Sequence, residues 1–336
     1  MTTITPRRLA VSSLLAAGAL LLAGCGSAVA PAATGTDDGR EPVSLQNCGR
    51  DFVVDEVPDA VVGMHPSQTE LLLRLGVADR LVGQAQAAAQ ALPADVADLA
   101  ADVPVIGGAM PPSREDLLSV QPDFVYSPTT YEFTAEQGFA SIEQLDQAGS
   151  AVYVATGGCS DRRMTGEVAD LFTDIDNLGA IFDVRAEADQ LVSQARADLA
   201  VVADAIEDVD RLRVAQVYVE GTTLSAIGAG VEYDILALAG ADNVFSPDQP
   251  AFADFFAAAI TPESLAAEAP DALVFTVYDE NHESAVRDYL TSTFPDLPAV
   301  REGRLIAVSS ADVFPGTLGN VSAVRQIAEG LYPEAF

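Results

Sequence analysis

Tyrosines and arginines near the ends of predicted strands are the side chains of this chain best suited to bind a small molecule. In parallel sheets, ligands bind beyond the carboxyl ends of the strands. The chain has no Trp, so tyrosines would supply the aromatic lining, and each combines an apolar face with a polar tip. A pocket of Tyr and Arg suits an oxygen-rich ligand. The candidate contact residues are Met64, His65, Tyr126, Tyr131, Arg162, Arg163, Tyr218, Tyr233 and Tyr278.

Some of these candidates have an equally simple structural role. Arg162 and Arg163 form the densest basic pair of an acidic chain, yet they could instead pair with nearby acids such as Asp161 and Glu167. His65 follows a predicted strand, so it could line a pocket or serve as a cap or turn residue before the next helix. The sequence leaves both alternatives open.

Catalysis is not expected from this set of residues. The chain has two histidines and no Lys, which excludes Schiff-base chemistry and the P-loop lysine. It has neither a Gly-x-Ser-x-Gly nor a His-Glu-x-x-His motif, and Ser67 two positions after His65 does not define a catalytic geometry. We expect His282 on a helix surface. We therefore predict no catalytic residues, no metal ligands and no resident cofactor.

A repeated phrase indicates two similar halves. The two copies are residues 113–125 and 261–273, and each opens with a hydroxyl residue. Counted from this residue, Glu follows after two positions, Leu after four, Pro after nine and Asp after ten, and then an apolar run begins. The hydroxyl residue suits a helix N-cap. Pro262 of the second copy suits the first helical position, because a backbone N–H there would have no partner within the helix. The later Pro ends the helix, and a buried strand follows. Each copy is one helix–turn–strand piece of an α/β unit.

The glutamates of the two phrases, Glu115 and Glu263, have two interpretations. Each lies in a first helical turn, where the helix dipole favours a negative charge. The pair could also form two docking points, one on each half of the molecule. The residues alone do not separate these interpretations.

Hydrophobic periodicity predicts an alternating α/β order. A hairpin is expected from residues 43–46 and 51–54, and Ser67 could cap the first helix. Further strands are predicted at 60–64, 81–83, 124–126, 151–155, 213–219, 273–277 and 305–308, and further helices at 134–148, 232–239, 283–290 and 321–331. This order predicts a parallel sheet in each half.

The longest periodic segment, residues 182–209, carries apolar residues in steps of three and four. As one helix it would span roughly 40 Å at 1.5 Å per residue, which is longer than one half of the molecule. We expect it to join the halves as a strut, although an ordinary long surface helix gives the same pattern. The predicted organisation is residues 1–24 as leader, 25–44 as tether, 45–181 and 211–336 as two lobes, and 182–210 as the helix between them.

The first residues predict export and lipid attachment. Arg7 and Arg8 precede a short apolar stretch that ends in Leu-Ala-Gly-Cys at Cys25. This tetrapeptide resembles a bacterial lipobox, in which the chain is cut before the Cys and its thiol is lipidated. The small, polar residues that follow are typical of a flexible tether. We expect a soluble domain attached by lipid on Cys25 to the outer face of the cytoplasmic membrane.

The formal charge is −33 over 336 residues. So acidic a surface argues against nucleic acid and against anionic lipid as partners. The two cysteines besides Cys25 are Cys48 and Cys159, and two thiols in an exported protein predict one disulfide. Free buried thiols are the alternative.

Four further segments carry motifs in a fixed order and spacing: residues 61–71, 75–83, 239–244 and 297–305. Together they resemble the substrate-binding proteins of ABC importers for ferric siderophores, haem and cobalamin. The resemblance runs over residues 50–334, and its order and spacing are specific although no single motif is. Residues 61–71 are similar to the family's strand–Ser-Pro-x-x-Thr-Glu–helix opening, and residues 75–83 follow it closely. Residues 239–244 resemble its Ala-Gly-Gly-x-Asn-Val, and residues 297–305 its Leu-x-Ala-Val-x-x-Gly-Arg-Val.

The resemblance implies two Rossmann-like α/β lobes, each with a central parallel sheet, joined by one rigid helix with a ligand cleft between them. It implies a binding protein without catalysis, a monomer that delivers an iron(III)-siderophore to a permease powered by a separate ATPase. In this family the glutamate of each phrase contacts permease arginines, which favours docking by Glu115 and Glu263. Haem, cobalamin or a deazaflavin cofactor precursor are alternative cargoes. Free-metal binding is disfavoured because it needs several converging His and carboxylates.

Overall fold

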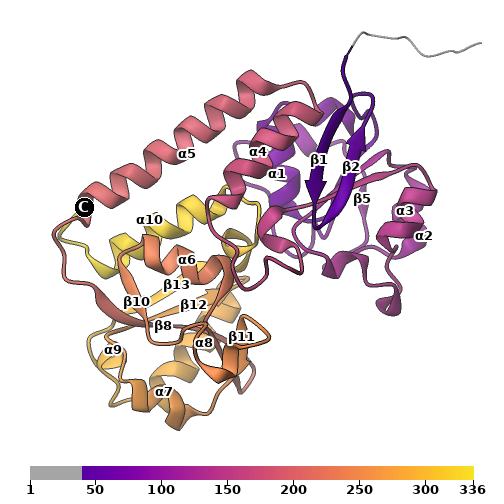
Figure 1. The fold of residues 1–336 in the computed structure, drawn as a ribbon. Helices are drawn as coiled ribbons and strands as arrows, with labels where there is room; N and C mark the ends of the chain where they lie inside the picture. The colour runs from indigo at the N-terminus through magenta and orange to yellow at the C-terminus, as the bar shows by residue number, and fades with distance from the viewer. Residues whose placement is uncertain (1–39) are drawn as a thin grey trace, which may run out of the picture. The chain divides into compact units, whose positions relative to one another are not determined.

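The computed structural model describes residues 40–336, which contain two sheets covered by helices (Figure 1). The predicted leader, lipobox and lipid-bearing Cys25 lie outside these residues. Among residues 40–336, no helix is both long and apolar enough to cross a membrane.

The first lobe is built on a five-stranded sheet in the order β5-β4-β3-β6-β7, and all its neighbouring strands are parallel. Its strands are β3 (Val61–Gly63), β4 (Leu81–Ala85), β5 (Val105–Ile106), β6 (Phe124–Ser127) and β7 (Ala151–Val154). Side chains of β6 alternate between two apolar clusters: Phe124 and Tyr126 pack on one face of the sheet and Val125 on the other. The predicted parallel sheet is confirmed for this lobe.

The second lobe has a mixed six-stranded sheet, so the prediction of a parallel sheet is only partly right here. Strands β10, β8, β12 and β13 run parallel to one another, but β9 is antiparallel to both β8 and β11. A tight turn at Gly221 allows β9 to fold directly back onto β8, without a crossover helix. The strands are β8 (Leu212–Glu220), β9 (Thr223–Ile227), β10 (Ala241–Asn243), β11 (Ala257–Ala259), β12 (Ala272–Val277) and β13 (Leu305–Ser309).

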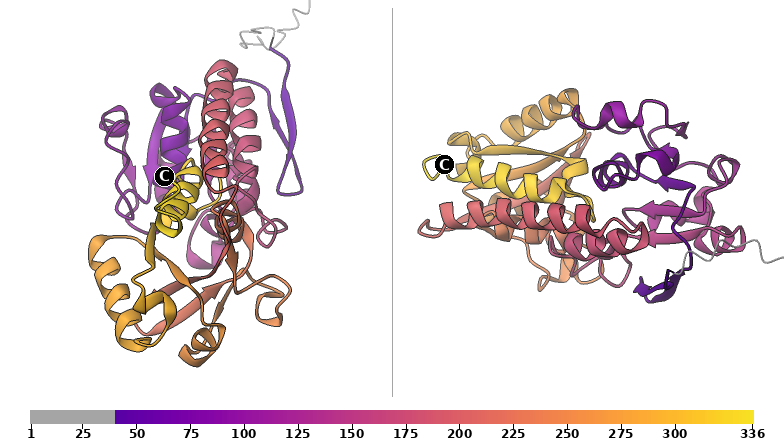
Figure 2. Two further views of the ribbon diagram at one scale, coloured as in Figure 1. Left: turned by 90° about the vertical axis from the view of Figure 1, so that its left-hand side faces the viewer. Right: turned by 90° about the horizontal axis from the view of Figure 1, so that it is seen from above.

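Helices cover both faces of the sheets (Figure 2). In the first lobe they are α1 (Pro66–Arg74), α2 (Arg114–Ser119), α3 (Ile142–Gln147) and α4 (Asp170–Ile181). In the second they are α6 (Gly230–Leu238), α7 (Pro262–Glu268), α8 (Glu280–Thr293), α9 (Pro298–Arg301) and α10 (Gly319–Leu331). The segment 134–148 forms a helix only from Ile142, and a 3-10 turn precedes it.

The repeated phrase folds as its residues predict. Ser113 and Thr261 cap α2 and α7, and each side chain accepts a hydrogen bond from a first-turn backbone N–H. Each helix is followed by a buried strand, β6 and β12 respectively. The repeat therefore marks the same helix–turn–strand unit in both lobes.

The periodic segment 182–209 is shorter as a helix than predicted. Helix α5 covers Arg185–Ala205, about 31 Å at 1.5 Å per residue. The break before it lies at Asp183, whose φ of 58° is left-handed and ends the preceding helix α4. The apolar stripe hid this break because the residues that flank it are also apolar.

Helix α5 contacts helices of both lobes. Its buried residues Ala188, Ala195 and Val202 recur every seven positions and lie in one apolar cluster with α4 of the first lobe and α10 of the second. Figure 1 shows α5 running alongside both of these helices. The small side chains Ala188 and Gly179 allow close approach of α5 and α4.

The two lobes also meet through a loop after β13. The Tyr126 hydroxyl donates to the Gly316 carbonyl oxygen at 3.0 Å, and Gln68 Nε2 donates to the Pro315 carbonyl at 3.1 Å. Gly316 has a φ of 69°, and a Cβ there would lie 2.6 Å from the Tyr126 hydroxyl oxygen. Glycine is required at this position for both reasons.

A disulfide joins Cys48 to Cys159, as predicted from the cysteine count. Cys48 lies in the turn of a two-stranded antiparallel hairpin, β1 (Val43–Asn47) and β2 (Arg50–Val54), which confirms the predicted hairpin. Strand β1 begins inside the predicted tether. The Asn47 side chain donates to the Val154 carbonyl oxygen at 2.7 Å, so the hairpin is held against the end of β7 at a second point.

The outer edge of the second sheet is capped by side chains. Strand β13 pairs with β12 on one side only. On its other side Arg287 of α8 donates to the Leu305 carbonyl oxygen at 3.1 Å, and Gln326 of α10 donates to the Ala307 carbonyl oxygen at 2.7 Å. Two backbone acceptors of this edge are therefore already occupied.

Candidate functional site between the lobes

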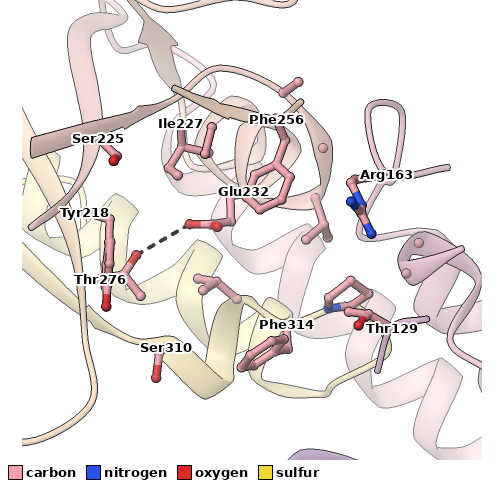
Figure 3. Close-up of a pocket in the computed structure, with 18 residues that line it drawn as sticks. Thr129, Arg163, Tyr218, Ser225, Ile227, Glu232, Phe256, Thr276, Ser310 and Phe314 are labelled. Atoms are coloured by element: carbon pink, nitrogen blue, oxygen red, sulfur yellow. Dashed lines mark hydrogen bonds between the residues drawn. The ribbon is translucent and has the colours of Figure 1, made fainter. Parts of the chain in front are cut away.

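A cavity of about 330 Å³ lies where the lobes face each other (Figure 3). The first lobe contributes the residues after β6 and β7, and the second contributes β8, β9, β11, the start of α6 and the loop after β13. Most lining atoms are apolar, and the few polar groups are hydroxyls, one arginine and one carboxylate. The lining residues are Thr129, Gly157, Gly158, Arg163, Tyr218, Ser225, Ile227, Ala229, Gly230, Val231, Glu232, Phe256, Ala257, Thr276, Ser310, Val313, Phe314 and Pro315.

Arg163 is the basic group of the cavity, and it comes from the first lobe. Its guanidinium carbon lies 5.4 Å from the centre of the Phe255 ring of the second lobe, a cation–π contact. The loop that carries Arg163 touches α6 as well, since the Gly230 N–H donates to the Met164 carbonyl oxygen at 3.2 Å. This loop begins at Cys159, so the disulfide anchors one of its ends.

The neighbouring Arg162 has a different role. Its Nη2 lies 2.6 Å from Asp170 Oδ1 and 2.8 Å from Oδ2, and Asp170 is only 8% exposed. Hydrogen bonding to Asp170 raises the pKa of Arg162. Of the two arginines predicted at the site, Arg163 lines the cavity and Arg162 forms an ion pair at the start of α4.

Glu232, on the first turn of α6, is the acidic group of the cavity. Its Oε2 accepts hydrogen bonds from Gln216 Nε2 and, at 3.4 Å, from the Thr276 hydroxyl. Protein atoms surround the carboxylate, and this burial raises the pKa of Glu232 to about 7. Within residues 40–336 no salt bridge reaches it.

Tyr218 lines the cavity and begins an aromatic cluster that leads to the surface. Its ring meets His282 edge-on, and His282 stacks on Tyr278 with ring centres 3.8 Å apart. The hydroxyls of Tyr218 and Tyr278 both donate to Glu220, at 2.7 and 3.1 Å. These hydrogen bonds lower the pKa of Glu220. Tyr278 lies outside the cavity and is 44% exposed.

His282 is buried, which corrects the expectation that it lies on a helix surface. It is 8% exposed, and its Nε2 lies 2.9 Å from the Val219 carbonyl oxygen. The side chain belongs to α8 but faces the sheet, between two tyrosines.

Four of the candidate residues lie elsewhere. Met64, directly after β3, and Tyr126, within β6, are fully buried in the core of the first lobe, because helices and the Gly316 loop still cover the chain there. Tyr131 is 43% exposed and packs against Phe139. Tyr233 is half-buried on α6, next to Glu232 but outside the cavity lining.

His65 caps α1, the second of its two predicted roles, and Ser67 is not the cap. Its Nδ1 lies 2.7 Å from Ser67 Oγ, a contact that a nucleophile–base pair would also make. Both side chains are 5% exposed and neither lines the cavity. Burial lowers the pKa of His65 to about 4. Its ring packs on Phe314, with centres 4.7 Å apart, so it supports the cavity wall from behind.

Metal-ligating side chains do not gather within the described part of the chain: residues 40–336 contain no group of three or more His, Cys, Asp or Glu side chains that could hold a metal ion. The repeat glutamates, by contrast, are on the surface. Glu115 is 88% exposed on α2, and Glu263 is exposed on α7. Each lobe therefore presents one of them to solvent.

Sequence reasoning missed most of the second lobe's lining. Glu232, Phe256 and Phe314 were not among the candidates. Glu232 had a detectable signal, an acidic residue in a helix that is otherwise mostly apolar. Phe256 and Phe314 lie in irregular segments, where apolar residues do not recur with the period of a helix or a strand.

The chain belongs to the periplasmic binding protein family, whose sequence model matches residues 61–311. It is 23% identical to YvrC of Bacillus subtilis (strain 168), an uncharacterized ABC transporter substrate-binding lipoprotein, over 98% of this chain and 99% of the relative. The family predicted from the sequence motifs is thereby confirmed.

Solved structures share the fold. A periplasmic binding protein from Veillonella parvula is 24% identical with a TM-score of 0.76, covering 87% of this chain and 98% of that one. An ABC-type Fe3+-hydroxamate transport system protein from Saccharomonospora viridis is 24% identical with a TM-score of 0.71, covering 87% and 99%. A periplasmic heme binding protein from Pseudomonas aeruginosa is 21% identical with a TM-score of 0.65, covering 83% and 94%.

Proposed function

We propose that this protein captures an iron(III)-siderophore outside the cell and delivers it to the permease of an ABC importer. The observation that carries the proposal is the cavity, whose walls come from both lobes. A ligand there contacts both lobes at once, so it favours their closed arrangement by its differential affinity for that state. Membership of the periplasmic binding protein family and similarity to YvrC, which is named as a substrate-binding lipoprotein, support the transport role.

The charges of the cavity favour a neutral or cationic chelate. Among residues 40–336, Arg163 is the single basic residue of the lining and Glu232 the single acidic one. A polyanionic catecholate complex would meet one guanidinium, one carboxylate and a chain of net charge −33. A ferric hydroxamate avoids this repulsion, and the similar fold of a Fe3+-hydroxamate transport protein is consistent with it.

The proposed assembly follows from the surface of each lobe. Glu115 and Glu263 would contact arginines of the permease, and the lipid on Cys25 would hold the protein at the membrane. Residues 45–181 and 211–336 would act as lobes and residues 182–210 as the joint between them. We propose a monomer, with transport powered by an ATPase on the other side of the membrane.

Ligand titration tests the cargo. The protein is titrated with a ferric trihydroxamate, a ferric tris-catecholate, haem and cobalamin, and binding is followed by tyrosine fluorescence and by native mass spectrometry. We expect the trihydroxamate to bind at least ten times more tightly than the catecholate. Tighter binding of the catecholate would reject the charge argument, and tighter binding of haem or cobalamin would replace the siderophore by that cargo.

A further inference from the structure

Glu232 occupies an unusual position for a carboxylate. It lines an apolar cavity, it comes from the first turn of α6, and none of the salt bridges within residues 40–336 involves it. The Glu232 side chain is half-buried, and the cavity walls shield its carboxylate from bulk solvent. A shielded carboxylate without a cationic partner costs free energy, because it has lost part of its water. A structural role alone would be served as well by Gln, which accepts the same hydrogen bonds without a charge.

The two oxygens of Glu232 are used differently. Both hydrogen bonds that it accepts, from Gln216 and Thr276, go to Oε2. Oε1 accepts none of the hydrogen bonds within residues 40–336, and it is not among their fully buried unpaired atoms. Figure 3 shows the carboxylate inside the ring of lining residues, with Thr276 on one side and Phe256 above it. The geometry therefore holds one oxygen in place and leaves the other to the cavity.

The remaining polar groups of the cavity cannot supply the missing cation. Arg163 comes from the other lobe and lies over Phe255, and no salt bridge joins it to Glu232. The other polar side chains of the lining are the hydroxyls of Thr129, Tyr218, Ser225, Thr276 and Ser310. Hydroxyls can donate to a carboxylate but do not neutralise it.

We propose that Glu232 binds a protonated amine of the cargo, so that the chelate carries an ammonium group which enters the second lobe. This inference rests on the proposed function and adds one chemical group to the cargo. The cargo replaces the missing cation and donates to Oε1, a charge-assisted hydrogen bond. The strongly negative chain attracts the same kind of ligand at longer range.

The test compares two chelates that differ in one charge. The first is the ferric complex of a linear trihydroxamate with a free terminal amine, and the second is the same complex with that amine acetylated. Each is titrated against the protein and against Glu232→Gln, with Glu143→Gln, exposed on α3, as the matched control. We expect the amine complex to bind the unaltered protein about 10-fold or more tighter. In Glu232→Gln this preference disappears, while the acetylated complex binds as before.

A second pair of probes separates failure of the inference from failure of the siderophore proposal. Benzylammonium and benzyl alcohol match an apolar cavity with one carboxylate and involve no metal, and their binding is followed by ligand-observed NMR. If neither chelate binds but benzylammonium is preferred through Glu232, the siderophore proposal fails and the inference stands. The inference is overturned when neither pair shows a preference for ammonium, or when the preference persists in Glu232→Gln. Thermal unfolding of each variant confirms that it is folded.

Discussion

The hydroxyl of Tyr126 donates a hydrogen bond to the carbonyl oxygen of Gly316, at 3.0 Å, between residues 190 positions apart. Tyr126 lies in β6 of the first lobe, one residue before the strand ends, and Gly316 lies in the loop of the second lobe that carries Phe314 and Pro315 into the cavity wall. This hydrogen bond therefore couples the junction of the lobes to the wall of the candidate site.

Removing that hydroxyl is expected to weaken the junction. Tyr126→Phe leaves the buried Gly316 carbonyl without this donor and should lower the free energy of unfolding by about 1–3 kcal/mol. Urea unfolding followed by circular dichroism measures the change. Tyr131→Phe is the control, because Tyr131 is exposed. Equal stability of the two variants would show that the Tyr126 hydroxyl contributes nothing.

The adjacent arginines should separate binding from stability. Arg163→Gln removes the basic group of the cavity and is expected to weaken ferric trihydroxamate binding roughly 10-fold with little loss of stability. Arg162→Gln breaks the contact with Asp170 instead, and should lower the free energy of unfolding by about 1 kcal/mol with little effect on affinity. Titration and urea unfolding of both variants check this. The same loss of affinity in both would contradict the assignment of Arg163 to the site.

The disulfide closes a long loop, since its cysteines are 111 positions apart. Replacing both Cys48 and Cys159 by Ser should lower the free energy of unfolding by about 3–5 kcal/mol, because the unfolded chain gains freedom. Urea unfolding with and without reductant measures it. Reductant should destabilise the unaltered protein and leave the double variant unchanged; a protein insensitive to reductant would refute the prediction.

The repeat glutamates should affect delivery but not capture. Glu115→Gln and Glu263→Gln are each expected to reduce uptake of an ⁵⁵Fe-labelled trihydroxamate several-fold, and the double variant should nearly abolish it. Affinity for the chelate should not change, because both side chains are exposed and outside the cavity lining. Glu143→Gln is the matched control. Normal uptake by the double variant would leave the helix dipole as the only role of these residues.

A buried carboxylate should make stability depend on pH. Asp174 is fully buried and accepts hydrogen bonds from the Tyr153 hydroxyl, at 2.8 Å, and from the N–H and hydroxyl of Thr156. Burial raises the pKa of Asp174 to about 7, against its usual 3.8. Between these values the folded protein keeps a proton that the unfolded chain has lost, so stability falls as pH rises from about 4 to about 7.

The variant Asp174→Asn separates the pH dependence that Asp174 causes from the pH dependence that other groups cause. The lowered pKa of His65 acts in the opposite direction, since the neutral ring makes stability rise between about pH 4 and 6.5. The difference in unfolding free energy between Asp174→Asn and the unaltered protein cancels the His65 contribution. From pH 5 to pH 8 this difference should shift in favour of the variant by about 2–3 kcal/mol, since about two pH units lie between pH 5 and the raised pKa of Asp174. A difference that is constant with pH would disprove it.

Helix starts and ends could be predicted where the residues that determine them are neighbours in the sequence. Ser113 and Thr261 cap their helices through first-turn N–H groups, and the prolines that end the phrases need no tertiary contact to act. Helix α4 was not predicted at all. The start of α5 was placed too early because Asp183 adopts a left-handed φ without being Gly, between the apolar residues Phe182 and Val184. Strands β9 and β11 were missed because their pairing depends on the turn at Gly221 and on segments distant in sequence.

The candidate site was only partly predictable because its walls come from distant segments. Arg162 and Arg163 are identical in type and adjacent, and only the positions of Asp170 and Phe255 separate their roles. Tyr126 lies at a strand end, as a ligand contact would, yet the Gly316 loop covers it. Glu232 is an acidic residue in a mostly apolar helix, but its place in the candidate site becomes evident only once the cavity around it is known.

The capped edge of β13 has a consequence for crowding. A strand from a neighbouring molecule could extend this sheet only by displacing Arg287 and Gln326 from the carbonyls that they occupy. Strand pairing between neighbouring molecules at this edge is therefore disfavoured, even where many copies lie side by side. Each copy would remain a separate molecule, able to bind and release its own ligand.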